Sequence, residues 1–148
     1  MKLKRIIKIS GDKNPILSVS LKDILGCIKS IERITWAILW LEAVAALENN
    51  TSIVHLEDKI NNSDNATIIS WEQLLILSNQ IIQGINLLIL GDKKQSNLKK
   101  YLKDEDMFMS CDYTIELIDS SYWIIHSNDE DFFNNVFESL SGVEYVSS

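Results

Sequence analysis

The stretch "GINLLILG", residues 84–91, decides the fold because it has the composition of a central strand. Between its two glycines, only Asn86 is polar among six residues that are otherwise Ile or Leu. A short apolar run with glycine at both ends is typical of a strand that is covered on both faces of a sheet. We therefore expect a strand over 85–91, with the other elements arranged around it.

Four further segments have the composition of strands: "KRIIKIS" (4–10), "YTIELID" (113–119), "YWIIHS" (122–127) and, as a closing strand, "GVEYV" (142–146). Ser120-Ser121 joins the second and third of these, which predicts a hairpin. The turn lacks the Asn-Gly or Gly-x pair that a two-residue turn prefers, so Asp119 could belong to a longer loop. In a tight hairpin, His126 would face Ile115.

Three serines indicate helix starts, each with an acid or amide three residues later. Ser20 precedes Asp23, and the pairs Ser70/Gln73 and Ser127/Glu130 match the capping box, which satisfies backbone N–H groups at a helix N-terminus. Apolar residues at helical spacing extend the second helix to about residue 83 and support the third over 132–140. The polar stretches 48–52, 61–67 and 91–97 are interpreted as loops.

Segment 33–47 is ambiguous. Ile34, Thr35, Trp36, Ile38 and Trp40 favour a strand, whereas "EAVAALE" (42–48) favours a helix. We expect a strand through about residue 41. The whole chain, 1–148, is then predicted to be a single α+β domain with a mostly antiparallel sheet and helices packed on it.

Composition favours a soluble, cytoplasmic protein. The 148 residues are 46% hydrophobic and 24% charged, enough to form one sizeable core. The longest apolar stretch, 34–47, contains Glu42 and is too short to span a membrane. Cys27 and Cys111 have no metal-binding or disulfide spacing, so we expect both to be buried thiols.

The distribution of charge is the most informative feature for function. From Asp104 to Ser148 there are eleven Asp or Glu and no Lys or Arg, within a chain of net charge −7. A surface of one sign attracts oppositely charged partners and repels nucleic acid and anionic membranes. We therefore expect a basic protein partner and neither direct nucleic-acid binding nor membrane binding, although the lysines of 93–103 could contact phosphate locally.

Some of these acids have purely structural explanations. Asp129, Glu130 and Asp131 would stabilise the first turn of a helix through its dipole, and 104–106 ("DED") could be a solvated loop. Acids and aromatics at a hairpin tip are harder to explain without a partner, and Trp123 is the best candidate for an anchor. The predicted partner-binding residues are Asp104, Glu105, Asp106, Asp119, Tyr122, Trp123, Asp129 and Glu130.

Catalysis has weaker support in the sequence. Glu116, Asp119 and His126 form a possible acid–base set, but strand pairing does not bring their side chains within the hydrogen-bond distance that proton transfer requires. Glu42, inside an apolar run, is the one charge expected to be buried, either with Arg33 as a structural ion-pair partner or as an acid in a pocket. No phosphate-binding loop, metal motif or nucleophile motif occurs, so neither a cofactor nor a metal is expected.

Two segments resemble the small acidic immunity proteins of bacterial polymorphic and contact-dependent toxin systems. They are "SWEQLLILSNQIIQGINLLILGDK" (70–93) and "YTIELIDSSYWIIHSNDEDFFNNVFESL" (113–140). The shared feature is the order of a capped helix, a central strand, an acidic aromatic hairpin and a last helix. The resemblance implies a non-catalytic protein that binds one cognate toxin, often a cationic nuclease, and blocks its action.

Two alternatives to the immunity hypothesis stay open at this point. One is a small enzyme or ligand-binding domain whose pocket contains Glu42 and His126. The other is an oligomerising scaffold, which would expose a large apolar patch and form a stable dimer.

Overall fold

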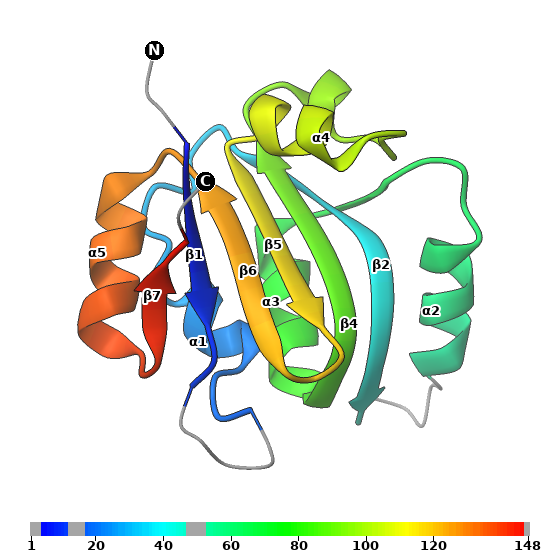
Figure 1. Cartoon of the computed structure of the whole chain (residues 1–148). Helices are drawn as coiled ribbons and strands as arrows, with labels where there is room; N and C mark the ends of the chain where they lie inside the picture. The colour runs from blue at the N-terminus through cyan, green and yellow to red at the C-terminus, as the bar shows by residue number, and fades with distance from the viewer. Residues whose placement is uncertain (1–3, 12–16, 47–52, 147–148) are drawn as a thin grey trace.

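The computed structural model describes residues 4–11, 17–46 and 53–146, and its centre is one antiparallel sheet of seven strands in the order β3-β2-β4-β5-β6-β1-β7 (Figure 1). The strands are β1 (Arg5–Ile9), β2 (Thr35–Ala45), β3 (Thr67–Ile69), β4 (Ile81–Asp92), β5 (Tyr113–Ile118), β6 (Tyr122–Ser127) and β7 (Val143–Tyr145). The helices are α1 (Leu21–Leu25), α2 (Ile53–Asn61), α3 (Trp71–Gln80), α4 (Asp104–Ser110) and α5 (Glu130–Ser139), with a short 3₁₀ helix at Gln95–Asn97. The predicted α+β class is confirmed.

Strand β4 is central, as "GINLLILG" predicted, but it is longer than expected. Both glycines lie inside the strand and do not bound it. At Gly91 the indole of Trp36 packs so closely that a Cβ atom there would lie 2.6 Å from the ring. The glycine is therefore required by close packing between β4 and its neighbour β2.

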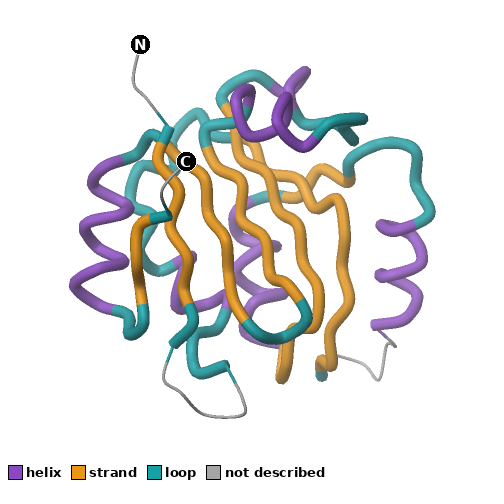
Figure 2. The backbone as a smooth tube through the Cα atoms, viewed as in Figure 1, coloured by secondary structure: helices purple, strands orange, loops and turns teal. Residues whose placement is uncertain are grey.

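The main core lies on one face of the sheet. Helices α1, α3 and α5 lie on this face of the sheet (Figure 1 and Figure 2). Large side chains of these helices and of the strands form one buried cluster. Residues central to this core include Ile9, Trp36, Ile89, Ile115 and Phe132. A second, smaller cluster on the opposite face lies beneath α4 and the segment before it.

The strand predicted in segment 33–47 is confirmed as β2, and it continues past Leu41 to Ala45. Its register against β4 shifts at three places, including one between Ile38 and Trp40. The pairing of β2 with β3 ends at Ile38. Further along β2, the side-chain amide of Asn61 makes the hydrogen bonds of a neighbouring strand. Its oxygen accepts from the Leu41 N–H at 2.8 Å, and its nitrogen donates to the Leu41 carbonyl at 2.9 Å. Helix α2 is thereby fixed beside the sheet edge.

The serine caps at Ser20 and Ser70 form complete capping boxes, so both predicted helix starts are confirmed. Helix α3 ends at Gln80 and not near residue 83, because the chain enters β4 directly at Ile81. The predicted cap at Ser127 is wrong: this serine is buried at the end of β6, and its hydroxyl accepts from the Asp129 N–H at 3.1 Å.

The hairpin between β5 and β6 is confirmed, but its turn is centred one residue earlier than predicted. Asp119 and Ser120 have φ of 48° and 56°, and the Ser121 N–H donates to the Ile118 carbonyl at 2.8 Å. Positive φ at both central residues characterises a type I′ turn. The register therefore places His126 opposite Thr114 and not opposite Ile115.

Three elements were not predicted: α2, β3 and α4. The "DED" acids occupy the first turn of α4 and are not part of a loop. The predicted loops at 61–67 and 91–97 are shortened by the ends of α2, β3 and β4, and the predicted loop at 48–52 lies outside the described residues. Cys27 and Cys111 are buried free thiols, as expected.

Candidate functional site

One row of side chains crosses the face of the sheet opposite the main core. Strand register aligns Lys8, Ile124, Glu116, Leu88 and Trp40 across β1, β6, β5, β4 and β2. Trp40 is 41% exposed and the other four are half-buried, so the row is accessible along its length. Figure 1 looks onto this face, with α1 and α3 behind the sheet.

A second accessible row adjoins the first, towards the hairpin turn. It contains Tyr122 opposite Ile118 and, on the neighbouring strand pair, Asn86 opposite Glu42. The Trp40 indole N–H donates to a Glu42 carboxylate oxygen at 2.7 Å, which fixes the direction of the exposed ring. We call the surface formed by Trp40, Glu42, Leu88, Glu116, Tyr122 and Ile124 the open sheet face.

The row on the other side of this surface is covered by α4. His126, Thr114, Leu90 and Ala37 occupy that row, and all four are buried. The Phe108 ring of α4 stacks on the imidazole of His126, with centroids 3.7 Å apart and planes 7° apart. Because α4 is a short helix at one end of the sheet, it leaves the next two rows uncovered (Figure 1).

Glu116 has the most distinctive electrostatic environment of the open sheet face. Its cross-strand neighbours are the apolar Leu88 and Ile124, and no cation pairs with its carboxylate in the part of the chain that the structure describes. Burial raises the pKa of Glu116 above its ordinary value, and the nearby Asp104 carboxylate raises it further. A half-buried acid among apolar side chains is electrostatically unsatisfied, and a cation placed beside it would stabilise its charged form.

The predicted acids Asp104, Glu105 and Asp106 adjoin this surface. They are exposed in the first turn of α4, where the helix dipole favours them. Of the three, Asp104 lies near enough to Glu116 to raise the pKa of its carboxyl. The structure thus brings Asp104 near Glu116, which the sequence had considered only as a catalytic residue, whereas Glu105 and Asp106 follow in the same turn.

At the opposite end of the same surface lie Asp119 and Tyr122. Asp119 is exposed in the turn, and its N–H donates to the Asn86 side chain at 3.0 Å. Tyr122 is half-buried on the second row, with the ammonium of Lys8 4.7 Å from its ring centroid. Both residues are positioned to contact a partner that covers the open sheet face.

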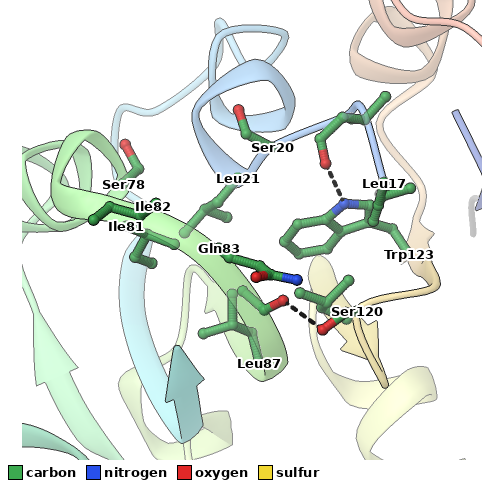
Figure 3. Close-up of a pocket in the computed structure, with 13 residues that line it drawn as sticks. Leu17, Ser20, Leu21, Ser78, Ile81, Ile82, Gln83, Leu87, Ser120 and Trp123 are labelled. Carbon is green, nitrogen blue, oxygen red and sulfur yellow. Dashed lines mark hydrogen bonds between the residues drawn. The ribbon is translucent and has the colours of Figure 1, made fainter. Parts of the chain in front are cut away.

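Trp123 was predicted to be an exposed anchor, and this prediction is wrong. Its side chain is only 2% exposed and its indole N–H donates to the Val19 carbonyl at 2.9 Å. Figure 3 shows the indole facing a cavity of about 70 Å³ beside Leu17 and Leu21. This volume is far below the roughly 300 Å³ at which small-molecule pockets begin, so the cavity is a packing feature.

Asp129 and Glu130 lie apart from the other predicted residues. Asp129 is the N-cap of α5: one carboxylate oxygen accepts from the Phe132 N–H at 3.0 Å, and the other accepts from the Tyr113 hydroxyl. Burial is the largest cause that raises the pKa of Tyr113 above its ordinary value, and the hydrogen bond to Asp129 raises it further. Asp129 therefore has a structural role, whereas Glu130 is exposed in the first turn of α5.

A polar groove of about 350 Å³ lies at this second location. Carboxylates from Glu32, Asp112, Asp129 and Asp131 line it. Burial raises the pKa of Asp112, and the neighbouring Asp92 raises it further. Across the described residues, no group of three or more His, Cys, Asp or Glu has the arrangement of a metal site.

The structure does not bring Glu42 and His126 together. Three strand spacings separate β2 from β6, or about 14 Å. His126 is buried beneath Phe108, and burial lowers its pKa to about 4, so its ring is neutral at physiological pH. Arg33 precedes β2, whereas Glu42 lies well along that strand and pairs with Trp40, so the expected Arg33 ion pair is wrong.

Three residues of the open sheet face were not predicted as site residues: Trp40, Leu88 and Ile124. Leu88 and Ile124 alternate with core residues, as Ile124 does with Trp123 and Ile125, and this alternation would identify them once the covered face of each strand was known. Trp40 could not be found in this way, because alternation from Trp36 and Ile38 would place it on the core face, and the register shift between Ile38 and Trp40 moves it to the open sheet face.

Comparison of the chain with protein-family models, with curated proteins and with solved structures finds no match. Among the described residues, none of the helices has the length and apolar composition to cross a bilayer.

Proposed function

We propose that this chain is a cytoplasmic, non-catalytic binding protein that neutralises a cognate basic toxin domain, such as a nuclease, by charge-complementary docking. The observation that carries the proposal is the open sheet face itself, an accessible surface with carboxylates at its centre and at the adjoining turn of α4. Trp40, which is exposed on this face and held by Glu42, supplies an aromatic side chain of the kind that often anchors protein interfaces.

The charge of the molecule supports this proposal. Glu42, Glu116 and the α4 acids lie on or beside the face, whereas Lys8 lies in its row and Lys103 immediately precedes the α4 acids. These carboxylates would attract a basic partner to the open sheet face. Blocking access of the toxin to its substrate requires a docking surface and no chemistry from this chain.

The first experiment is affinity capture of partners from a lysate of source cells at low and raised salt. We expect one basic protein, bound stoichiometrically and released by salt, and we expect co-expression of this chain to protect cells from that protein. Failure to recover a basic partner that is confirmed to be expressed would contradict the proposal.

A charge-reversal variant then tests the docking side. Changing Asp104, Glu105 and Asp106 to Lys should lower the association rate constant at least about tenfold and flatten its dependence on salt. The matched control changes Asp58, Glu72 and Glu138 to Lys, which alters net charge equally at exposed positions on α2, α3 and α5. Equal effects of the two triple variants would show that net charge, and not this side of the molecule, governs association.

A further inference from the structure

We propose that the centre of the open sheet face receives an arginine side chain of the partner, whose guanidinium pairs with Glu116 and whose stem lies along Leu88 towards Trp40. This assignment rests on the proposed function, because it names the contact through which a basic partner is held. It assigns the charge attraction between the two proteins to one position, the carboxylate of Glu116.

The geometry around Glu116 supplies the first argument. Its carboxylate lies in the middle of the row, between Leu88 and Ile124, with no cation to pair with among the described residues. The cation in the same row, Lys8, is on β1, whose backbone is two strand spacings, or about 10 Å, from that of β5, and its ammonium is held over the Tyr122 ring and does not pair with Glu116. Among the described residues, no positive charge therefore neutralises the Glu116 carboxylate.

The neighbouring carboxylates strengthen the requirement for a cation. Asp104 of α4 lies close enough to disfavour the ionised form of Glu116, and Glu42 adds a further acid on the same surface. A cation from outside the chain would relieve this repulsion and the cost of partial burial together. Such a cation would be more strongly bound here than at a fully solvated acid.

The apolar neighbours favour arginine over lysine. A guanidinium is planar and weakly hydrated, packs on flat apolar or aromatic surfaces, and pairs with a carboxylate through two parallel hydrogen bonds. Leu88, Ile124 and the ring of Tyr122 surround Glu116 on the face. A lysine ammonium would lose more hydration there and gain fewer hydrogen bonds.

Trp40 provides the apolar contact for the rest of the partner segment. It lies two strands from Glu116 in the same row, which is about the length of an extended arginine side chain plus its backbone. Its hydrogen bond to Glu42 holds the ring in place before binding, so little side-chain entropy is lost on contact. Tryptophan and arginine are also the residues that most often dominate binding energy at protein interfaces.

The test uses the full-length, isotope-labelled chain and two capped peptides, one with alternating Arg and Val and one with Lys in place of Arg. We expect backbone amide shifts at Leu88, Glu116 and Ile124 and at the Trp40 indole, with at least threefold tighter binding of the arginine peptide. Glu116→Gln should weaken that binding at least tenfold. Glu138→Gln, an equal charge change at an exposed position on α5, should alter it less than twofold.

Three results would overturn the assignment. The first is an equal loss of peptide affinity in the two glutamine variants. The second is NMR shifts that are confined to α4 or to the groove at Asp129. The third is shifts at Trp40 and Glu116 that depend on protein concentration without peptide, which would identify a second copy of the chain as the occupant. If the NMR spectrum of Glu116→Gln is no longer that of the native fold, Trp40→Leu is used as the test variant in its place. It should weaken binding of the arginine peptide at least threefold. An unchanged affinity in that variant would also overturn the assignment.

The outcome can be separated from that of the proposed function. If the peptide binds as expected but no toxin is captured, the arginine site is supported and the proposal of toxin neutralisation is contradicted. If a toxin is captured, and its binding depends on the α4 acids but not on Glu116, toxin neutralisation is supported and the arginine site is contradicted.

Discussion

Trp40 and Trp123 lie on opposite faces of the same sheet, and their surroundings give them different roles. Trp123 fills the main core and donates to the Val19 carbonyl, whereas Trp40 is 41% exposed and donates to Glu42 on the open sheet face. Burial and a hydrogen bond to backbone make the first a stability residue. Exposure and a hydrogen bond to a neighbouring acid make the second available to a partner.

This difference predicts unequal effects of the same substitution. Trp123→Phe should lower the free energy of unfolding by about 1–3 kcal/mol, because it leaves the buried Val19 carbonyl without this donor. Trp40→Phe, the matched control, should change it by less than about 1 kcal/mol. Urea denaturation of both variants measures these values, and similar losses would show that Trp40 is also a core residue.

A second prediction at the residue scale concerns His126 and pH. Burial, and then the charge of Lys4, lower its pKa in the folded protein from 6.5 to about 4, so the unfolded chain takes up this proton first as pH falls. The stability that neutral His126 contributes is therefore complete above about pH 6.5 and is lost progressively towards pH 4. Around the ring, Ile6 and Thr114 flank it on the neighbouring strands, Lys4 just before β1 is the charged group that acts on it, and Phe108 covers it from α4.

His126→Phe tests this by removing the titrating group while keeping an aromatic ring for Phe108 to stack on. Between pH 7.5 and pH 5, the wild type should lose about 1–2 kcal/mol more unfolding free energy than the variant, with solvent screening allowed for. Glu116 and Asp112, whose raised pKa values act in the opposite direction, are present in both proteins and cancel. Parallel pH dependences would contradict the pKa assigned to His126.

At the scale of elements, the start of α5 shows how one acid can serve the fold. Asp129 caps the helix and accepts from the buried Tyr113 hydroxyl, so it connects α5 to β5. Asp131, two residues later, is exposed in the first turn and has only the helix dipole to stabilise it. The acids of this turn are therefore not equivalent, although they are adjacent in the sequence.

Asp129→Ala should lower the free energy of unfolding by about 2–3 kcal/mol, because it removes both the cap and the acceptor of a buried hydroxyl. Asp131→Ala should cost less than about 1 kcal/mol, since only its interaction with the helix dipole is lost. Urea denaturation at neutral pH compares the two. Equal losses would mean that the cap and the Tyr113 contact contribute little.

The sequence predicted strands and two helix starts well because their signals are local. "GINLLILG" is a continuous apolar run, and the serines of α1 and α3 form capping boxes with residues three positions later. The N-cap of α5 was assigned to Ser127 because a capping-box spacing cannot show that β6 continues through that serine. Helices α2 and α4 were missed because no serine with an acid or amide three residues later marks their starts in the sequence, and the position of α2 depends on contacts such as that of Asn61 with Leu41.

The site was predicted only in part, for a related reason. The sequence identified the acids of α4 and the hairpin turn, but it placed Trp123 outside and overlooked Trp40 as a contact residue. Both tryptophans lie in strands with apolar neighbours, and only the sheet register determines which face each one occupies. Which rows α4 covers is likewise a property of the tertiary fold.

At the scale of the whole molecule, its two sheet faces have different uses. Helices α1, α3 and α5 close one face over a continuous apolar core, whereas α4 closes only one end of the other. Of the acids in the last third of the sequence, Glu116 shares the open side with Glu42 of β2 and Asp104 lies near it, whereas Asp112, Asp129 and Asp131 line the separate groove. Antiparallel sheets commonly have one packed and one solvated face, and the proposed function assigns the open one to a partner.

The same asymmetry distinguishes a binding protein from an oligomerising scaffold. In a symmetric dimer formed through the open sheet face, Glu42 and Glu116 of one copy would face the same acids of the other, and each chain carries a net charge of −7. Repulsion should prevent this association. Sedimentation velocity at about 0.1 M salt should therefore show a single species of 16.9 kDa, and charge screening at about 1 M salt tests whether repulsion alone keeps the copies apart. A stable dimer at the lower salt concentration that is lost in Trp40→Arg would favour the scaffold, because that substitution disrupts only an interface that includes this face.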